Sequence, residues 1–135
     1  MTFFAWDPKL LLGVDDMDAE HRGLIAAMND IHDRAEQGAS KAVLGGLVKS
    51  LVDLTRKHFS HEEARMKAAG YDGFENHTWV HKDLLAKLDQ HVSDFQAGPG
   101  KLAPAFFSFL RLWLTAHIMG IDRKYAPTLA GKRVA

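Results

Sequence analysis

The stretch HFSHEEARM, residues 58–66, lies inside a segment whose apolar residues recur with the spacing of an α-helix. The apolar stripe of that segment runs from Leu44 to Met66, yet two positions on it hold His58 and Glu62. A buried polar group without a partner costs about 1–3 kcal/mol, and a charged one costs more. Two such residues on the buried side of one helix therefore predict a ligand or polar partners inside the core.

The composition describes one folded domain that covers residues 1–135. Hydrophobic residues make up 47% of the chain, and 17 Lys and Arg balance 17 Asp and Glu. A neutral chain offers no basic surface for nucleic acid, and no apolar run approaches the roughly 20 residues that span a bilayer. The chain has no Cys, which excludes Fe–S clusters and thiolate zinc sites. It starts without a secretory signal pattern, so we expect a cytoplasmic protein that neither binds nucleic acid nor inserts into a membrane.

Four long segments have helical periodicity, and none alternates with the period of a strand. They cover residues 18–37, 40–69, 74–97 and 101 to about 125, with breaks at Gly38, at GYDG (70–73) and at GPG (98–100). Because short connections make neighbouring helices antiparallel, we expect an all-α, up-down-up-down four-helix bundle over residues 18–126. Residues 1–17 should form an ordered arm with apolar side chains against the bundle. Pro127 should limit the last helix and leave 127–135 as a short tail.

Each predicted helix carries polar residues on its apolar stripe. The set is His21 in the first helix, His58 and Glu62 in the second, His77 and His81 in the third, and His117 and Asp122 in the fourth. In an up-down-up-down bundle, the starts of odd helices and the ends of even helices share one end, so all seven side chains should reach one level. The spacing of four in two pairs puts both side chains on one helical face. His117 and Asp122, five apart and about 140° around a helix, converge only if their side chains reach round or the helix distorts near Gly120.

A metal centre explains these residues better than hydrogen bonding among themselves. A single buried histidine is usually a satisfied core residue, but five imidazoles need more acceptors than two carboxylates supply. Seven ligands are too many for one tetrahedral zinc and suit two six-coordinate ions. If Glu62, Asp122 and a solvent-derived oxygen bridge the ions, the histidines divide as three and two. One ion then has six donors, and the other has five and one open position.

This ligand set resembles that of the hemerythrin family, in particular the bacterial single-domain hemerythrins. The opening FAWDPKLLLGVDDMDAEHRGL and the later stretch FLRLWLTAHIMGIDRKYAP are similar to the family as well. The resemblance implies reversible O2 binding at two non-haem iron ions, bridged by an oxo or hydroxo group and by the carboxylates of Glu62 and Asp122. It implies that one iron is held by His77, His81 and His117, and that His21 and His58 hold the iron with the open position.

The resemblance also implies an apolar O2 pocket, for which plain core packing is the alternative. Its lining would be Leu24, Phe59, Trp113, Leu114 and Ile118. None of these side chains is an acid, base or nucleophile, so the sequence favours oxygen carriage, storage or delivery to an oxygen-consuming enzyme over catalysis. The alternatives are an O2 or redox sensor and a di-iron oxidase or peroxidase, and zinc would also bind such imidazoles. We expect a monomer, and we interpret the remaining polar residues near these helices as structural or surface residues: His32, His61, His91 and Glu63.

Overall fold

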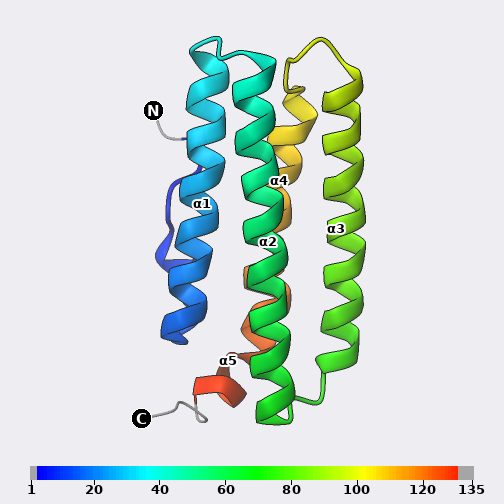
Figure 1. The fold of residues 1–135 in the computed structure, drawn as a ribbon. Coiled ribbons are helices and arrows are strands. Elements are labelled where there is room, and N and C mark those ends of the chain that lie inside the picture. The colour runs from blue at the N-terminus through cyan, green and yellow to red at the C-terminus, as the bar shows by residue number, and fades with distance from the viewer. Residues whose placement is uncertain (1–2, 131–135) are drawn as a thin grey trace.

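The computed structural model describes residues 3–130, and within that range all regular secondary structure is helical. Four long helices lie side by side along one axis, as Figure 1 shows, which confirms the expected all-α bundle with an ordered N-terminal arm. The elements are η1 (Pro8–Leu10), α1 (Asp15–Glu36), α2 (Lys41–Ala69), α3 (Phe74–Ala97), α4 (Pro104–Ala116), a π-helical turn η2 (His117–Asp122) and α5 (Arg123–Ala130).

Local chemistry accounts for several helix ends. The Ser40 hydroxyl accepts a hydrogen bond from the Val43 N–H at 3.2 Å and caps α2. Gly70 ends the same helix with φ at +69°, a left-handed conformation that favours glycine. Helix α1 begins at Asp15 rather than at the expected Asp18, because its acidic first turn complements the positive end of the helix dipole. Helix α4 begins at Pro104 rather than at residue 101, since proline suits the first helical position.

The expectation that Pro127 ends the last helix is wrong. Helix α5 continues through Pro127 to Ala130. The side chains of Tyr125 and Leu129 on either side of this proline are buried in a small hydrophobic cluster at this end of the bundle. Their burial holds the segment in helical form although proline donates no backbone hydrogen bond. The tail expected over 127–135 is therefore helical at its start, and residues 131–135 lie outside the described range.

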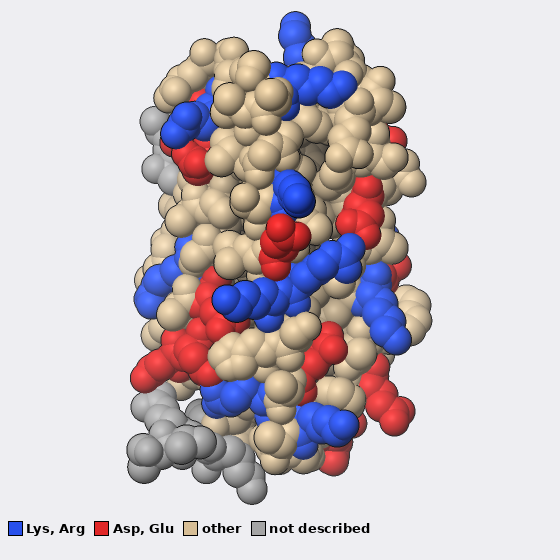
Figure 2. Space-filling view, in the orientation of Figure 1, with Lys and Arg blue, Asp and Glu red and all other residues tan. Residues whose placement is uncertain are grey.

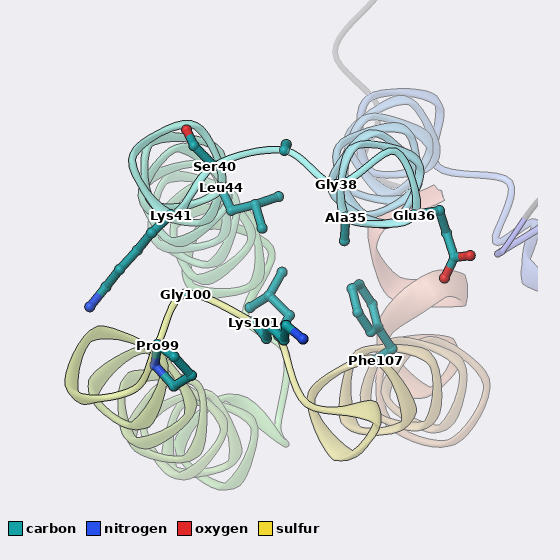
Figure 3. Close-up of a pocket in the computed structure, with 12 residues that line it drawn as sticks. Ala35, Glu36, Gly38, Ser40, Lys41, Leu44, Pro99, Gly100, Lys101 and Phe107 are labelled. Atoms are coloured by element: carbon teal, nitrogen blue, oxygen red, sulfur yellow. The ribbon is translucent and has the colours of Figure 1, made fainter.

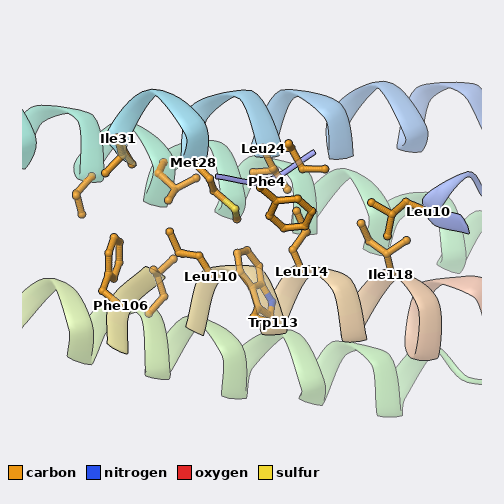
Figure 4. Close-up of a cluster of buried hydrophobic side chains, with 14 of the residues drawn as sticks. Phe4, Leu10, Leu24, Met28, Ile31, Phe106, Leu110, Trp113, Leu114 and Ile118 are labelled. Atoms are coloured by element: carbon orange, nitrogen blue, oxygen red, sulfur yellow. The ribbon is translucent and has the colours of Figure 1, made fainter. Parts of the chain in front are cut away.

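The apolar core is divided into two clusters. The larger one, which we call the main cluster, fills the bundle between α1 and α4, and part of it is shown in Figure 4: Phe4, Leu10, Leu24, Ile25, Met28, Ile31, Val48, Leu51, Phe59, Leu88, Phe106, Leu110, Trp113, Leu114 and Ile118. The smaller one, the end cluster, contains Val14, Met17, Met66, Tyr125, Ala126 and Leu129. The predicted ligand residues lie between the two clusters, at a height along the bundle that we call the polar level.

The N-terminal arm is tied to α1 by hydrogen bonds between its backbone and two side chains of α1. The Asn29 side chain accepts from the Phe4 N–H at 2.7 Å and donates to the Phe4 carbonyl at 2.8 Å. The buried Asp18 carboxylate accepts from the N–H groups of Leu12 and Gly13 at 2.8 and 3.0 Å. These bonds hold the Phe4 ring in the main cluster, next to Leu24 and Leu114 in Figure 4.

The surface and the last helix bear on possible partners. Figure 2 shows that positive and negative side chains alternate over the face in view, as the net charge of zero suggests. The helical run Pro104–Leu129, which the sequence pattern did not single out, is long and apolar enough to span a membrane, with mean hydropathy 1.2. A core helix passes the same test, and this run buries Phe106, Leu110 and Trp113 in the main cluster.

Candidate metal centre

The structure brings all seven sequence-predicted ligand residues to one level of the bundle. Each of them is buried, with no more than 4% of its surface exposed. They come from the start of α1, the end of α2, the start of α3 and the turn η2 that follows α4, as the antiparallel order requires. The set is His21, His58, Glu62, His77, His81, His117 and Asp122.

Glu62 lies between two groups of histidines. Its Oε1 is 3.0 Å from His77 Nε2 and 2.9 Å from His81 Nε2. Its Oε2 points the other way, 3.4 Å from His58 Nε2 and 3.8 Å from His21 Nε2. One carboxylate thus offers one oxygen to each group.

Asp122 divides its oxygens in the same manner. Its Oδ1 lies 3.0 Å from His77 Nε2 and 2.9 Å from His117 Nε2, and its Oδ2 lies 3.1 Å from His21 Nε2. The donors therefore form two overlapping sets that share both carboxylates. His77, His81 and His117 belong to one set, and His21 and His58 belong to the other.

The donor atoms have the arrangement of ligands rather than of a hydrogen-bonded network. Both oxygens of Asp122 are buried without a hydrogen-bond partner among the described residues. The same holds for the Nε2 atoms of His21, His58, His81 and His117. Buried polar atoms are rarely left unpaired in a native fold, so this many at one place fit the coordination of metal ions. Imidazole and carboxylate together suit iron and zinc.

The π-helical turn η2 solves the problem of the five-residue spacing. It begins at His117 and ends at Asp122, so that the distorted segment contains both residues and Gly120 between them. A π-turn forms i to i+5 hydrogen bonds and widens the helix by one residue. Both side chains consequently face the core, with His117 Nε2 2.9 Å from Asp122 Oδ1. Of the two alternatives that the sequence left open, the structure has the helix distortion near Gly120.

Two further carboxylates support the histidines, and sequence reasoning missed both. Glu20 Oε1 lies 2.7 Å from His58 Nδ1, and Glu63 Oε2 lies 2.7 Å from His81 Nδ1. Glu63, which the sequence analysis interpreted as a structural or surface residue, contacts a predicted ligand because α3 packs on that side of α2 and brings His81 to it. A proton on Nδ1 that is donated to a carboxylate leaves Nε2 free for a metal and fixes the ring orientation. Both glutamates stand directly beside a predicted ligand in the sequence, which is the signal that could have identified them.

The remaining polar contacts tune the charges of the centre. The Tyr125 hydroxyl donates to Glu62 Oε2 at 2.6 Å, and burial raises the pKa of Tyr125, so this donor keeps its proton. Burial opposes the ionisation of Glu20, but the hydrogen bonds of His58 and His61 outweigh it and lower the pKa of Glu20. Burial likewise opposes the charge on His58, but Glu20 and Glu62 raise its pKa to about 10. The metal-free centre is therefore a set of charged pairs.

The five residues expected to line a pocket are all buried in the main cluster: Leu24, Phe59, Trp113, Leu114 and Ile118. Phe59 stacks on the imidazole of His81, with ring centroids 3.7 Å apart and an angle of 5° between the planes. Its edge meets Trp113 at a centroid distance of 6.0 Å. Phe59 thus borders the centre directly from the side of the main cluster.

One surface hollow lies at an end of the bundle, and another opens beside the polar level. The first has a volume of about 440 Å³ and lies where the α1–α2 and α3–α4 connections meet, with Leu44 and Phe107 among its lining (Figure 3). This end is opposite to the polar level, so the hollow is separate from the centre. A second hollow of about 250 Å³ reaches His58 itself and is lined by Glu20, Leu54, Lys57, His58 and His61.

Comparison with known proteins agrees with this geometry. The profile of the hemerythrin HHE cation binding domain matches residues 12–129. The bacteriohemerythrin of Stenotrophomonas maltophilia strain R551-3 is 32% identical over 126 residues, which are 93% of this chain and 81% of that protein. The myohemerythrin of Riftia pachyptila is 32% identical over 93% of both chains. The crystal structure of a wild-type hemerythrin superposes with a TM-score of 0.85 and 28% identity, covering 94% of this chain and 98% of the other. The chain belongs to the hemerythrin family.

Proposed function

We propose that this protein binds O2 reversibly at a non-haem di-iron centre and serves in the carriage, storage or delivery of oxygen. The observation that supports this function best is the division of Glu62 and Asp122 between two groups of histidines. A carboxylate with one oxygen toward each group is suited to bridge two ions. The match to a cation binding domain and the similarity to a bacteriohemerythrin and a myohemerythrin support the same function.

In this proposal the two ions have unequal shares of the protein's donors. Three imidazoles (His77, His81 and His117) and two carboxylate oxygens would give one iron five protein donors. His21, His58 and the two other carboxylate oxygens would give the second iron four. The ion on the side of His21 and His58 would therefore have one protein donor fewer, which would leave an open position there for O2. Iron, when bound, would supply the electrons that O2 takes up and gives back.

The chain's own contribution is to orient donors and to exclude water. Glu20 and Glu63 hold the Nδ1 atoms of His58 and His81, which directs the Nε2 atoms toward the centre. The apolar residues beside the centre keep water and protons away from O2, which would otherwise cause irreversible oxidation of the iron. None of these five side chains is an acid or a base, and this favours carriage over catalysis. Action as a monomer, a cytoplasmic location and delivery to an oxygen-consuming enzyme remain predictions.

One experiment tests the function directly. The protein is loaded with iron, reduced without air and then exposed to O2, while absorption spectra are recorded. We expect two irons per chain and new charge-transfer bands that disappear under argon and return with O2. Bands that decay at once to an oxidised form, with iron intact, would instead indicate an oxidase or peroxidase.

A variant locates the activity at the proposed ions. His58→Ala should abolish reversible O2 binding, because it removes a donor of the ion with the open position, while most helicity remains. His91→Ala is the matched control, since the His91 ring lies against Phe109 rather than at the centre. O2 binding retained in His58→Ala would contradict the assigned role of this residue.

A further inference from the structure

We propose that His61 is a positioning residue for the metal centre, which acts through Glu20 to hold the His58 imidazole toward the ion with the open position. The proposal rests on the proposed di-iron function and adds to it a residue that the sequence pattern assigned to the surface. It names a chain of contacts, His61 to Glu20 to His58, that leads from the surface of the protein to one of the two ions.

The chain of contacts runs along the interface between α1 and α2. Glu20 on α1 uses both carboxylate oxygens: Oε1 lies 2.7 Å from His58 Nδ1, and Oε2 lies 2.5 Å from His61 Nδ1. On the other side of the His61 ring, Nε2 lies 3.6 Å from the carboxylate of Asp16, which in turn pairs with Arg65. Because Glu20 is held at both oxygens, it is restrained from rotating away from His58.

Burial decreases step by step along this chain. The His58 side chain is 2% exposed, that of Glu20 is 31% exposed and that of His61 is 42% exposed. Glu20, His58 and His61 also line the hollow of about 250 Å³ that opens to solvent. A carboxylate this exposed has rotameric freedom unless a second contact restrains it, and His61 supplies that contact.

The other four ligand histidines have no comparable support. Glu63 contacts His81 at 2.7 Å, but among residues 3–130 no second histidine pairs with Glu63. The Nδ1 atoms of His21, His77 and His117 are buried without a hydrogen-bond partner in the same range. On the side of the open position, His58 is therefore the one imidazole with an anchored Nδ1. Loss of the Glu20–His58 contact should therefore lower the affinity of the ion with the open position and leave the affinity of the other ion unchanged.

The experiment measures metal binding rather than oxygen binding. Ferrous iron is titrated without air into the metal-free protein, and the affinities of the two ions are determined for each variant. Removal of a carboxylate that orients a ligand histidine typically weakens metal binding about 10–100-fold. We expect Glu20→Gln to lower the binding affinity of one of the two ions within that range. His61→Ala should lower the affinity of the same ion by about 10-fold.

Three variants separate positioning from a general effect on the fold. His61→Asn keeps a donor at the place of Nδ1 and should retain the affinity of the unmodified protein, while His91→Ala controls for the loss of a partly exposed imidazole. In a protein that already carries His58→Ala, the further change His61→Ala should have no effect on the remaining ion. If the role of His61 were merely structural, His61→Ala would lower the affinity of both ions, and this effect would also occur in the His58→Ala protein.

The outcomes distinguish this inference from the proposed function. An unmodified protein that binds fewer than two ions overturns both. If the unmodified protein binds two ions and His61→Ala binds both with the same affinities as the unmodified protein, the positioning role is overturned and the di-iron function stands. If His61→Ala loses affinity for one ion only, and His61→Asn keeps that affinity, the positioning role of His61 is established.

Discussion

Eight histidines occur in the chain, and their contacts divide them into distinct roles. Five converge on Glu62 and Asp122 in the core. His61 contacts Glu20 at the surface, whereas His32 stacks on Phe3 and His91 lies against Phe109. The same type of side chain is therefore a candidate ligand in the core, a proposed positioning group at the surface and a packing group against an aromatic ring.

The charged state of the metal-free histidines predicts proton release on metal binding. Burial disfavours the charge on His58 and His117, but neighbouring carboxylates, Glu20 at His58 and Asp122 at His117, raise their pKa values to about 10 and about 9. Both imidazoles are therefore protonated at pH 7, and a metal must displace these protons. We expect affinity to rise with pH through 7 to 9, and the stability that these charged pairs give the metal-free protein to be lost as pH rises through about 9 to 10.

Calorimetric titration with Zn²⁺ in buffers of different ionisation enthalpy measures the protons released. The observed heat should depend on the buffer at pH 7 and much less near pH 10. A heat that is independent of the buffer at pH 7 would mean that the imidazoles are already neutral before the metal binds.

The packing of Leu114 predicts a link between core volume and oxidation rate. Leu114→Ala leaves a void beside the centre and should cost about 2–5 kcal/mol of stability. Water that enters the void should speed the oxidation of the oxygenated protein, followed by the decay of its absorption. Leu110→Ala is the control, because Leu110 is also fully buried but lies one helical turn farther from His117. Equal oxidation rates in the two variants would contradict a special role for Leu114.

At the scale of helices, the periodicity of apolar residues predicted features that depend on a single helix, such as its bounds. It missed contacts that depend on how neighbouring helices pack. The bounds of α3 are those expected from its apolar stripe and its flanking glycines. Glu63 was misread because a single helix does not reveal that His81 on α3 packs against this side of α2. Pro127 was misread for a similar reason, since burial of Leu129 in the end cluster outweighs the preference of proline. Six members of the polar set were predictable because they lie on apolar stripes, whereas Asp122 shares a face with His117 only through the π-turn η2.

The π-turn predicts that Gly120 is dispensable. The φ angle of Gly120 is not positive, and a Cβ added there would meet no atom within 4 Å. The turn is set by the burial of His117 and Asp122 at its two ends rather than by glycine flexibility. We expect Gly120→Ala to keep both metal ions and to raise the free energy of unfolding by up to about 1 kcal/mol.

Gly100→Ala is the matched control for that substitution. Gly100 has φ at +96°, and an added Cβ would lie 2.6 Å from the Cβ of Lys41. The same chemical change should therefore destabilise the protein here, as denaturant unfolding would measure. Loss of metal in Gly120→Ala would show that the π-turn needs the freedom of glycine.

At the scale of the whole molecule, the polar level separates two cores of unequal size. The main cluster extends from this level toward the α1–α2 connection, and the small end cluster joins the starts of α1 and α5 to the end of α2. The end cluster contains six buried residues, and α5 is short. Its stability should therefore depend on the cross-links that the metal ligands provide between helices.

This division predicts that metal removal opens one end of the bundle. Without metal, five buried imidazoles share two carboxylates, so buried charge at the polar level is incompletely paired, and the end cluster is too small to compensate. After chelation, hydrogen exchange should accelerate in α5 and in residues 62–69 of α2, while residues 44–52 of α2, which pack in the main cluster, keep their protection. Mass spectrometry of peptides from these segments compares the two ends. Acceleration over all of α2 would mean that metal stabilises the whole bundle, and unchanged exchange in α5 would mean that the charged pairs alone hold the centre closed.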